Sequence, residues 1–233
     1  MRLAGLSALT RKEINLYGQT NTLASLDTEE VAFLEDNFNK LLSTTDSQVR
    51  KIFEERADTI VAGVMAIKEK LERRKFRGMN PSDAEIGMGF IRPGYTKTAN
   101  VINTTWLVAL TGLPNWSAWL SGAAGAGGYT LSEDFGLIIT HFTSLVTPSP
   151  FIRTAHWVIG RVDLIPEDVT DIILGDNENG VAVFPIPTKI ILPEDELRVR
   201  LEGATGNEYL KLGGLVVGLG RFIKTEDLVA LAW

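Results

Sequence analysis

Apolar and polar residues follow two different spacings, which divide the chain into a helical part and a strand-rich part. Between residues 27 and 78, apolar residues recur every three or four positions, the spacing of one helix face. The first such run predicts a helix that begins near Asp27, a suitable N-cap, and ends before Ser43. Residues 1–26 lack a clear period, so we expect a flexible arm there.

A second run of this kind predicts one long helix from about Ser47 to Phe76. Its apolar residues alternate steps of four and three, which is typical of a coiled-coil seam. Gly78 and Pro81 end the helix. A seam of this type can contact a neighbouring subunit, and its candidate interface residues are Val49, Phe53, Ile60, Val64 and Leu71.

Beyond a glycine- and proline-rich linker at residues 79–97, short apolar runs are separated by turns. Strands are predicted at about 100–112, 136–146, 153–163, 170–174, 180–192, 196–202, 208–212 and 214–223. In the strand at 196–202, apolar and charged residues alternate, so one face meets water. The predicted fold class is α+β: an arm and helices, one of them long, followed by an antiparallel, jelly-roll-like β-sandwich over residues 98–233.

Composition removes several classes of site. The chain has 233 residues and no cysteine, which excludes disulfides, thiolate metal sites and a cysteine nucleophile. The net charge of −6 is unlike that of a protein built to neutralise phosphates. Residues 1–80 hold 13 basic and 12 acidic residues, whereas residues 81–233 hold 10 and 17, which supports a domain boundary near residue 80. The first residues lack a long apolar core, so no signal peptide is expected.

Residues 98–152 carry only two formal charges, on Glu133 and Asp134. A membrane span at residues 106–126 is one interpretation, but Pro114 and several glycines oppose it, and we expect none. The other interpretation is a strand followed by a long loop that a neighbouring molecule covers.

Two tryptophans in this stretch, Trp116 and Trp119, stand beside a glycine-rich tip that includes Gly125 and Gly127. Large aromatic side chains are common anchors of protein interfaces, so these four residues are candidate interface residues. A contact between the two tryptophans and the chain's own core is the alternative.

Residues with catalytic chemistry are few. His141 and His156 would form a metal or catalytic pair only if their strands were adjacent, and structural roles are favoured for both. The motifs of zinc proteases, serine hydrolases and phosphate-binding loops are absent from the sequence. Carboxylates that are neighbours in sequence beside turns do not indicate the facing pair of a glycosidase. We therefore predict no catalytic residue, no metal and no cofactor.

Basic residues gather at the end of the long helix. Lys70, Arg73, Arg74 and Arg77 are candidates for contact with phosphate. Cations at a helix C-terminus also compensate the helix dipole, and Glu69 is interleaved with them. Nucleic acid is therefore the less favoured partner.

The segment FPIPTKIILPEDELRVRLEG, residues 184–203, resembles the late strands of jelly-roll capsid-type proteins of bacterial and archaeal viruses. The resemblance covers about residues 100–233 and brings no catalytic residue with it. It implies a homo-oligomeric, self-assembling virion component, assembled in the host cytoplasm with copies of itself and other virion proteins. Two other functions stay open: a carbohydrate-binding module that stacks sugars on Trp116, Trp119 and Trp157, and a cupin-like or glycosidase enzyme.

Overall fold

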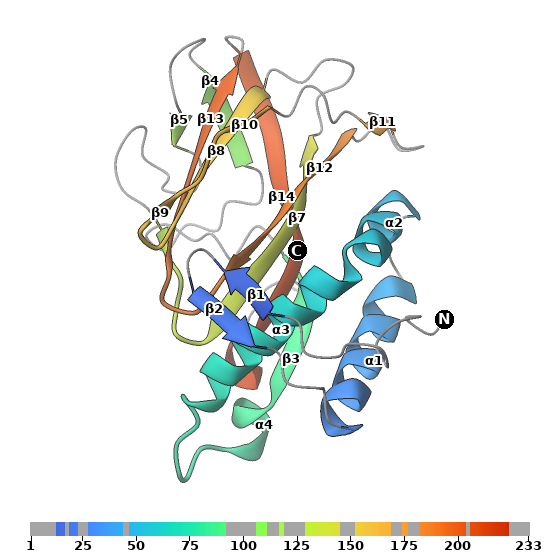
Figure 1. The fold of residues 1–233 in the computed structure, drawn as a ribbon, viewed down its shortest axis with the longest axis vertical. Helices are drawn as coiled ribbons and strands as arrows, with labels where there is room; N and C mark the ends of the chain where they lie inside the picture. The colour runs from blue at the N-terminus through green and yellow to red at the C-terminus, as the bar shows by residue number, and fades with distance from the viewer. Residues whose placement is uncertain are drawn as a thin grey trace.

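The structure is a computed structural model, in which helices and antiparallel sheets form an α+β fold (Figure 1). The predicted combination of helices with antiparallel sheets is therefore confirmed. None of the described helices is long and apolar enough to cross a membrane. The residues that the structure describes are 13–16, 19–22, 28–43, 47–91, 106–110, 117–118, 129–144, 152–168, 174–176, 182–203 and 206–223.

Four helices lie in the N-terminal part of the described chain: α1 (Thr28–Ser43), α2 (Ser47–Glu55), α3 (Ala57–Glu72) and α4 (Pro81–Ala84). The first confirms the helix predicted after residue 27. The single long helix predicted from Ser47 to Phe76 is wrong, because Arg56 interrupts it and it ends at Glu72. At the interruption Arg56 has φ −114° and ψ 15°, which is outside the α-helical region.

The first sheet is built around the long strands β7 (Phe135–Ser144), β12 (Ala182–Ile191) and β14 (Gly206–Leu219). Its order is β11-β12-β7-β14-β3, where β11 is Leu174–Asp176 and β3 is Ile86–Phe90. The strand β4 (Trp106–Leu110) pairs with the first part of β14, residues 206–210, whereas β3 pairs with its last part, residues 215–219. All of these pairings are antiparallel.

The second sheet is built around β8 (Ile152–Ile159) and β13 (Glu196–Gly203). Its order is β10-β8-β13-β5, with β10 at Glu167–Asp168 and β5 at Ser117–Ala118. Two further short strands extend it: β6 (Tyr129–Thr130) pairs with β13, and β9 (Val162–Asp163) pairs with β8. A separate hairpin of β1 (Glu13–Leu16) and β2 (Gln19–Thr22) lies within the predicted arm.

Three strand predictions need correction. Residues 208–212 and 214–223 were expected to be two strands, but β14 is continuous through a bulge at Gly213 and Gly214. The strand expected at 153–163 ends at Ile159, because a turn with Gly160 at φ 59° sends the chain back as β9. Part of the predicted linker at 79–97 is structured, since it contains α4 and β3.

The first sheet has a core on each of its faces. On one face, α1, α2 and α3 pack against side chains that include Ile138, Ile190 and Leu215. On the other face, side chains from both sheets share one apolar cluster, in which Phe142 stacks on Trp157 with ring centroids 5.5 Å apart. Figure 1 shows the resulting order of layers, with the helices on one side of β7, β12 and β14 and with β8 and β13 on the other.

Arg56 interrupts the helix because its side chain supplies hydrogen bonds where the pairing of two strands of the first sheet is broken. The ladder between β7 and β12 breaks between the pairs Pro185–His141 and Lys189–Ile139. At this gap the Arg56 guanidinium donates hydrogen bonds to the carbonyl oxygens of Thr140, at 3.0 Å, and of Ile186. Burial lowers the pKa of Arg56, while the nearby carboxylates of Glu55 and Glu167 act in the opposite direction.

We expect Arg56→Met to lower the free energy of unfolding by about 2–4 kcal/mol, because two buried carbonyl oxygens would lose their donor. Urea unfolding followed by circular dichroism measures the loss. Arg73→Met is the matched control, because the Arg73 side chain is 73% exposed and pairs only with Glu69 on its own helix. The control should lose less than about 1 kcal/mol. Equal losses for the two variants would show that Arg56 does not support the sheet.

Candidate functional site

The two histidines lie in different sheets and face different layers. His141, on β7, is buried and meets Phe53 of α2 edge-on, with ring centroids 6.4 Å apart. His156, on β8, contacts the carboxylate of Asp163, while its neighbours Ala155 and Trp157 point into the core. The two rings therefore cannot share a metal ion or a substrate. Among the residues that the structure describes, no group of three or more His, Asp and Glu side chains is placed to hold a metal.

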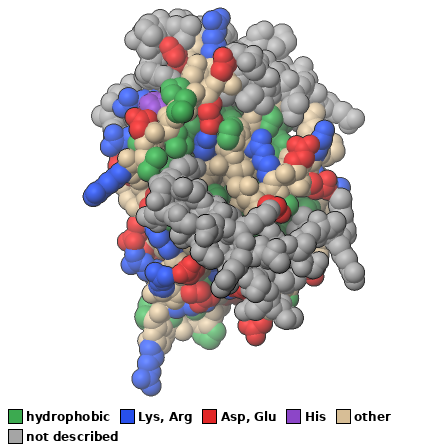
Figure 2. All heavy atoms as spheres, viewed as in Figure 1, with side chains coloured by type: hydrophobic (Ala, Val, Ile, Leu, Met, Phe, Trp, Pro, Cys, Tyr) green, Lys and Arg blue, Asp and Glu red, His purple; other side chains and the backbone are tan. Residues whose placement is uncertain are grey.

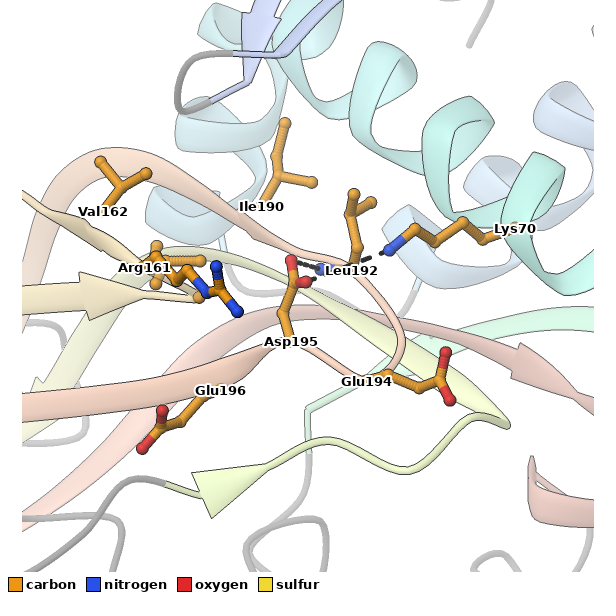
Figure 3. A pocket seen from close by; sticks show the side chains of 10 residues that line it. Lys70, Arg161, Val162, Ile190, Leu192, Glu194, Asp195 and Glu196 are labelled. Atoms are coloured by element: carbon orange, nitrogen blue, oxygen red, sulfur yellow. Dashed lines mark hydrogen bonds and ion pairs between the residues drawn. The ribbon is translucent and has the colours of Figure 1, made fainter.

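A pocket of about 420 Å³ opens between the end of α3, the turn after β8 and the turn after β12 (Figure 3). Its apolar wall includes Ile159, Ile190 and Leu192, and its charged residues are Lys70, Arg161, Glu194, Asp195 and Glu196. The strands predicted at 180–192 and 196–202 leave only Pro193–Asp195 between them, and the structure has a turn there in which Glu194 has φ 68°. The sequence therefore placed the acidic turn but gave no sign of the pocket beside it.

Asp195 is the central carboxylate of this pocket. Its Oδ2 accepts a hydrogen bond from the Leu192 amide at 3.3 Å, and its Oδ1 lies 4.0 Å from Lys70 Nζ. Figure 3 shows the carboxyl groups of Glu194 and Glu196 pointing away from Asp195, in different directions. Because no two of these carboxyl groups face each other, the pocket does not have the geometry of a glycosidase pair.

The basic end of α3 is tied to acidic turns of the same chain. Arg74 contacts the carboxylates of Glu194 and of Glu133, the latter at 3.4 Å. Lys70 donates to the Pro193 carbonyl at 3.4 Å, and Arg73 pairs with Glu69. These three candidates for phosphate contact therefore already have partners. The fourth, Arg77, is exposed at the tip beyond the helix and has no ion pair among the described residues.

Arg221 ties the acidic turn before β7 to the end of β14. It donates to Asp134 Oδ1 and lies 3.6 Å from Glu133 Oε1. The hydrogen bond with Asp134 raises the pKa of Arg221, against the smaller effect of burial. The acidic pair Glu133–Asp134 therefore holds Arg74 and Arg221 in place. These are the two charged residues of the stretch 98–152, and both have a structural role.

Most of the predicted interface residues on the helices are buried within the chain itself. Phe53, Ile60, Val64 and Leu71 belong to the core between the helices and the first sheet, and Val49 is half-buried against it. Their apolar surface is therefore used inside the chain and is not open to a partner. The other predicted interface residues, Trp116, Trp119, Gly125 and Gly127, lie outside the described residues.

Trp157 cannot act as a stacking platform for sugars, because its side chain is fully buried between the sheets. Lys189 Nζ lies 5.8 Å from the centre of the Trp157 ring and pairs with the Glu167 carboxylate. This buried ion pair connects β12 of the first sheet to β10 of the second. The pair is largely buried, and we assign it to stability.

Two large hydrophobic side chains stand out as exposed among the described residues: Phe76, at 60%, and Ile165, at 86%. Sequence reasoning missed both as interface candidates. Phe76 lies between Lys75 and Arg77, five residues beyond Leu71, the last residue of the predicted seam, so it takes no part in a periodic apolar pattern. Ile165 precedes Pro166 in an acidic segment between the strands predicted at 153–163 and 170–174, where a single apolar residue belongs to no pattern.

Comparison with known proteins adds no relative to this description. No protein-family model, no curated protein and no solved structure matches the chain.

Proposed function

We propose that the two sheets form a jelly roll and that the protein is a self-assembling structural protein, a component of a virion, without catalytic activity. The observation that carries the proposal is the order in which eight of the strands pair. In chain order these strands are β3, β5, β7, β8, β10, β12, β13 and β14.

The pairing of these strands is nested. The first pairs with the last, β3 with β14, and the second with the seventh, β5 with β13. The third pairs with the sixth, β7 with β12, and the central two, β8 and β10, pair with each other. Successive pairs alternate between the two sheets. A long antiparallel hairpin gives this nested order when it rolls around a core, which is the construction of a jelly roll.

Jelly rolls serve as capsid, lectin and cupin domains, so the fold alone does not select a function. Three observations bear on the choice: two weaken the alternatives, and one favours contact with other proteins. The chain's two histidines face different layers, which disfavours a cupin-like metal centre. Trp157, one of the three tryptophans expected to stack sugars, is buried. Phe76, an exposed aromatic side chain beside exposed basic residues, is of the type that is enriched in protein interfaces.

We expect the purified full-length protein to form assemblies larger than a dimer as its concentration rises, because a shell protein must bind several neighbours. Native mass spectrometry over a range of concentrations and salt, with electron microscopy of the same samples, measures the assemblies and their symmetry. A strict monomer under all of these conditions would overturn the proposal.

A further inference from the structure

The loop that carries Phe76 is ordered and basic. Its backbone closes a turn in which the Met79 amide donates to the Phe76 carbonyl at 3.2 Å, and Gly78, at φ 96°, occupies the position that needs a positive φ. Lys75 and Arg77 flank Phe76: Lys75 pairs with Glu72, whereas Arg77 is exposed and has no ion pair among the described residues. Figure 2 shows Lys and Arg side chains at the lower tip of the molecule, where Figure 1 draws the connection between α3 and α4.

The loop that carries Ile165 is also ordered, but it is acidic. The Leu164 amide donates to the Trp157 carbonyl at 2.9 Å, and Leu164 packs against the core between the sheets. The next side chain, Ile165, therefore points outward. The loop from Gly160 to Asp168 holds three acidic residues and one basic residue, Arg161; the carboxylates of Asp168 and of Asp163, which contacts His156, are exposed. Figure 2 shows acidic, basic and hydrophobic side chains together in the upper left, near a histidine, where Figure 1 draws β8 and β10.

The two loops are complementary in charge and alike in having one exposed apolar side chain. We propose that they are the two halves of one contact between copies of this chain: the Phe76 loop of one copy binds the Ile165 loop of the next. The inference rests on the proposed self-assembly and adds the surface through which it occurs. Aromatic side chains within a basic surface are typical interface anchors, and acidic side chains opposite them select the partner.

The contact is head-to-tail because its two halves are different surfaces at different places on the molecule. Figure 1 draws the α3–α4 connection at the lower end and β10 in the upper half, so each copy offers one free half to each of two neighbours. A contact of this kind continues from copy to copy and closes into a ring when the rotation between copies allows it. Pro166 and the short strands β9 and β10 disfavour strand addition at this edge, so the contact is made through side chains.

The test uses two full-length variants, Phe76→Ser and Ile165→Ser, each of which lacks one half of the contact. Each alone should self-associate at least about 10-fold more weakly than the wild-type chain, because each has lost an apolar anchor. Mixed in equal amounts, they should form a one-to-one complex, since each supplies the half that the other lacks. Asn39→Ser, an exposed change on α1, is the control and should assemble like the wild type. Circular dichroism and thermal unfolding check that all variants are folded.

Native mass spectrometry of the separate and mixed variants gives distinct outcomes. If the wild type assembles and both variants assemble equally well, this contact is overturned while the proposed self-assembly stands. If the variants do not associate alone and their mixture does not form the complex either, the head-to-tail pairing is overturned. If the wild type itself is a strict monomer, both proposals fall. Weakening of the one-to-one complex by added salt supports the charge pairing, and insensitivity to salt contradicts it.

Discussion

Replacing Lys189 with methionine is expected to lower the free energy of unfolding by about 3–5 kcal/mol, because the change leaves a buried carboxylate without its cation. Lys189 is only 4% exposed, and its ammonium group pairs with Glu167, whose side chain is 17% exposed. The second carboxylate oxygen, Glu167 Oε2, is already buried without a hydrogen-bond donor. Once Lys189 is removed, the carboxylate stays in a largely apolar surrounding with no ion-pair partner in contact, and the nearby charge of Arg56 compensates it only in part.

The double variant Lys189→Met with Glu167→Leu should recover most of the loss, because it replaces both charges with apolar groups of similar size. Urea unfolding of the wild type, the two single variants and the double variant gives the coupling energy of the pair. Arg198→Met is the matched control, since Arg198 and Glu196 form a half-exposed pair on β13. If Lys189→Met is no more destabilising than Arg198→Met, or if the double variant is as unstable as the sum of the single variants, the buried pair does not contribute as described.

Much of the second half of the fold could be predicted from the sequence because its strands obey a strict alternation. In β13, Leu197, Val199 and Leu201 are buried and the residues between them are not. The strand β3 could not be predicted in the same way. Its sequence, IGMGF, contains two glycines and reads as a turn, and it becomes a strand only because β14 offers a partner edge.

The break in the long helix has no local signal either. The residues around Arg56 are good helix formers, and the cause of the break is a gap between β7 and β12, more than 80 residues away in sequence. The burial of Lys189 could not be predicted for the same reason. A lysine in an apolar run does not indicate whether a carboxylate from another sheet will pair with it. The helix break at Arg56 and the buried Lys189 both depend on contacts between distant segments, which the local sequence pattern does not show.

The candidate surface was only partly open to sequence reasoning. The seam that includes Ile60 and Val64 was recognised as apolar, but pattern alone does not say whether a sheet of the same chain or a second copy covers it. Phe76 and Ile165 are the reverse case, because a single apolar residue among charges carries no periodic signal. Their exposure depends on the turns that hold them, one closed at Met79 and one beside Leu164.

Gly214→Ala is expected to destabilise the protein by about 3 kcal/mol or more, or to prevent folding, because both the backbone and the space at this position exclude a side chain. Gly214 lies at the bulge of β14 with φ 147°, a conformation that residues with a Cβ rarely adopt. A Cβ here would overlap the carbonyl oxygen of Ile138 on β7. The obstacle is backbone, so truncating a neighbouring side chain cannot relieve it.

The adjacent change, Gly213→Ala, separates the two causes. A Cβ on Gly213 would overlap the imidazole of His141, which is a side chain and can be shortened. Adding His141→Ala should therefore recover stability in Gly213→Ala but not in Gly214→Ala. Gly89→Ala is the control on the paired strand, because its Cβ would sit 3.7 Å from Val216, an ordinary contact, and it should change stability by less than about 1 kcal/mol. Soluble yield and thermal unfolding measure all five variants: the three single glycine changes and the two double variants with His141→Ala. Full recovery of Gly214→Ala by the histidine change would show that the bulge is held by the side chain and not by the backbone.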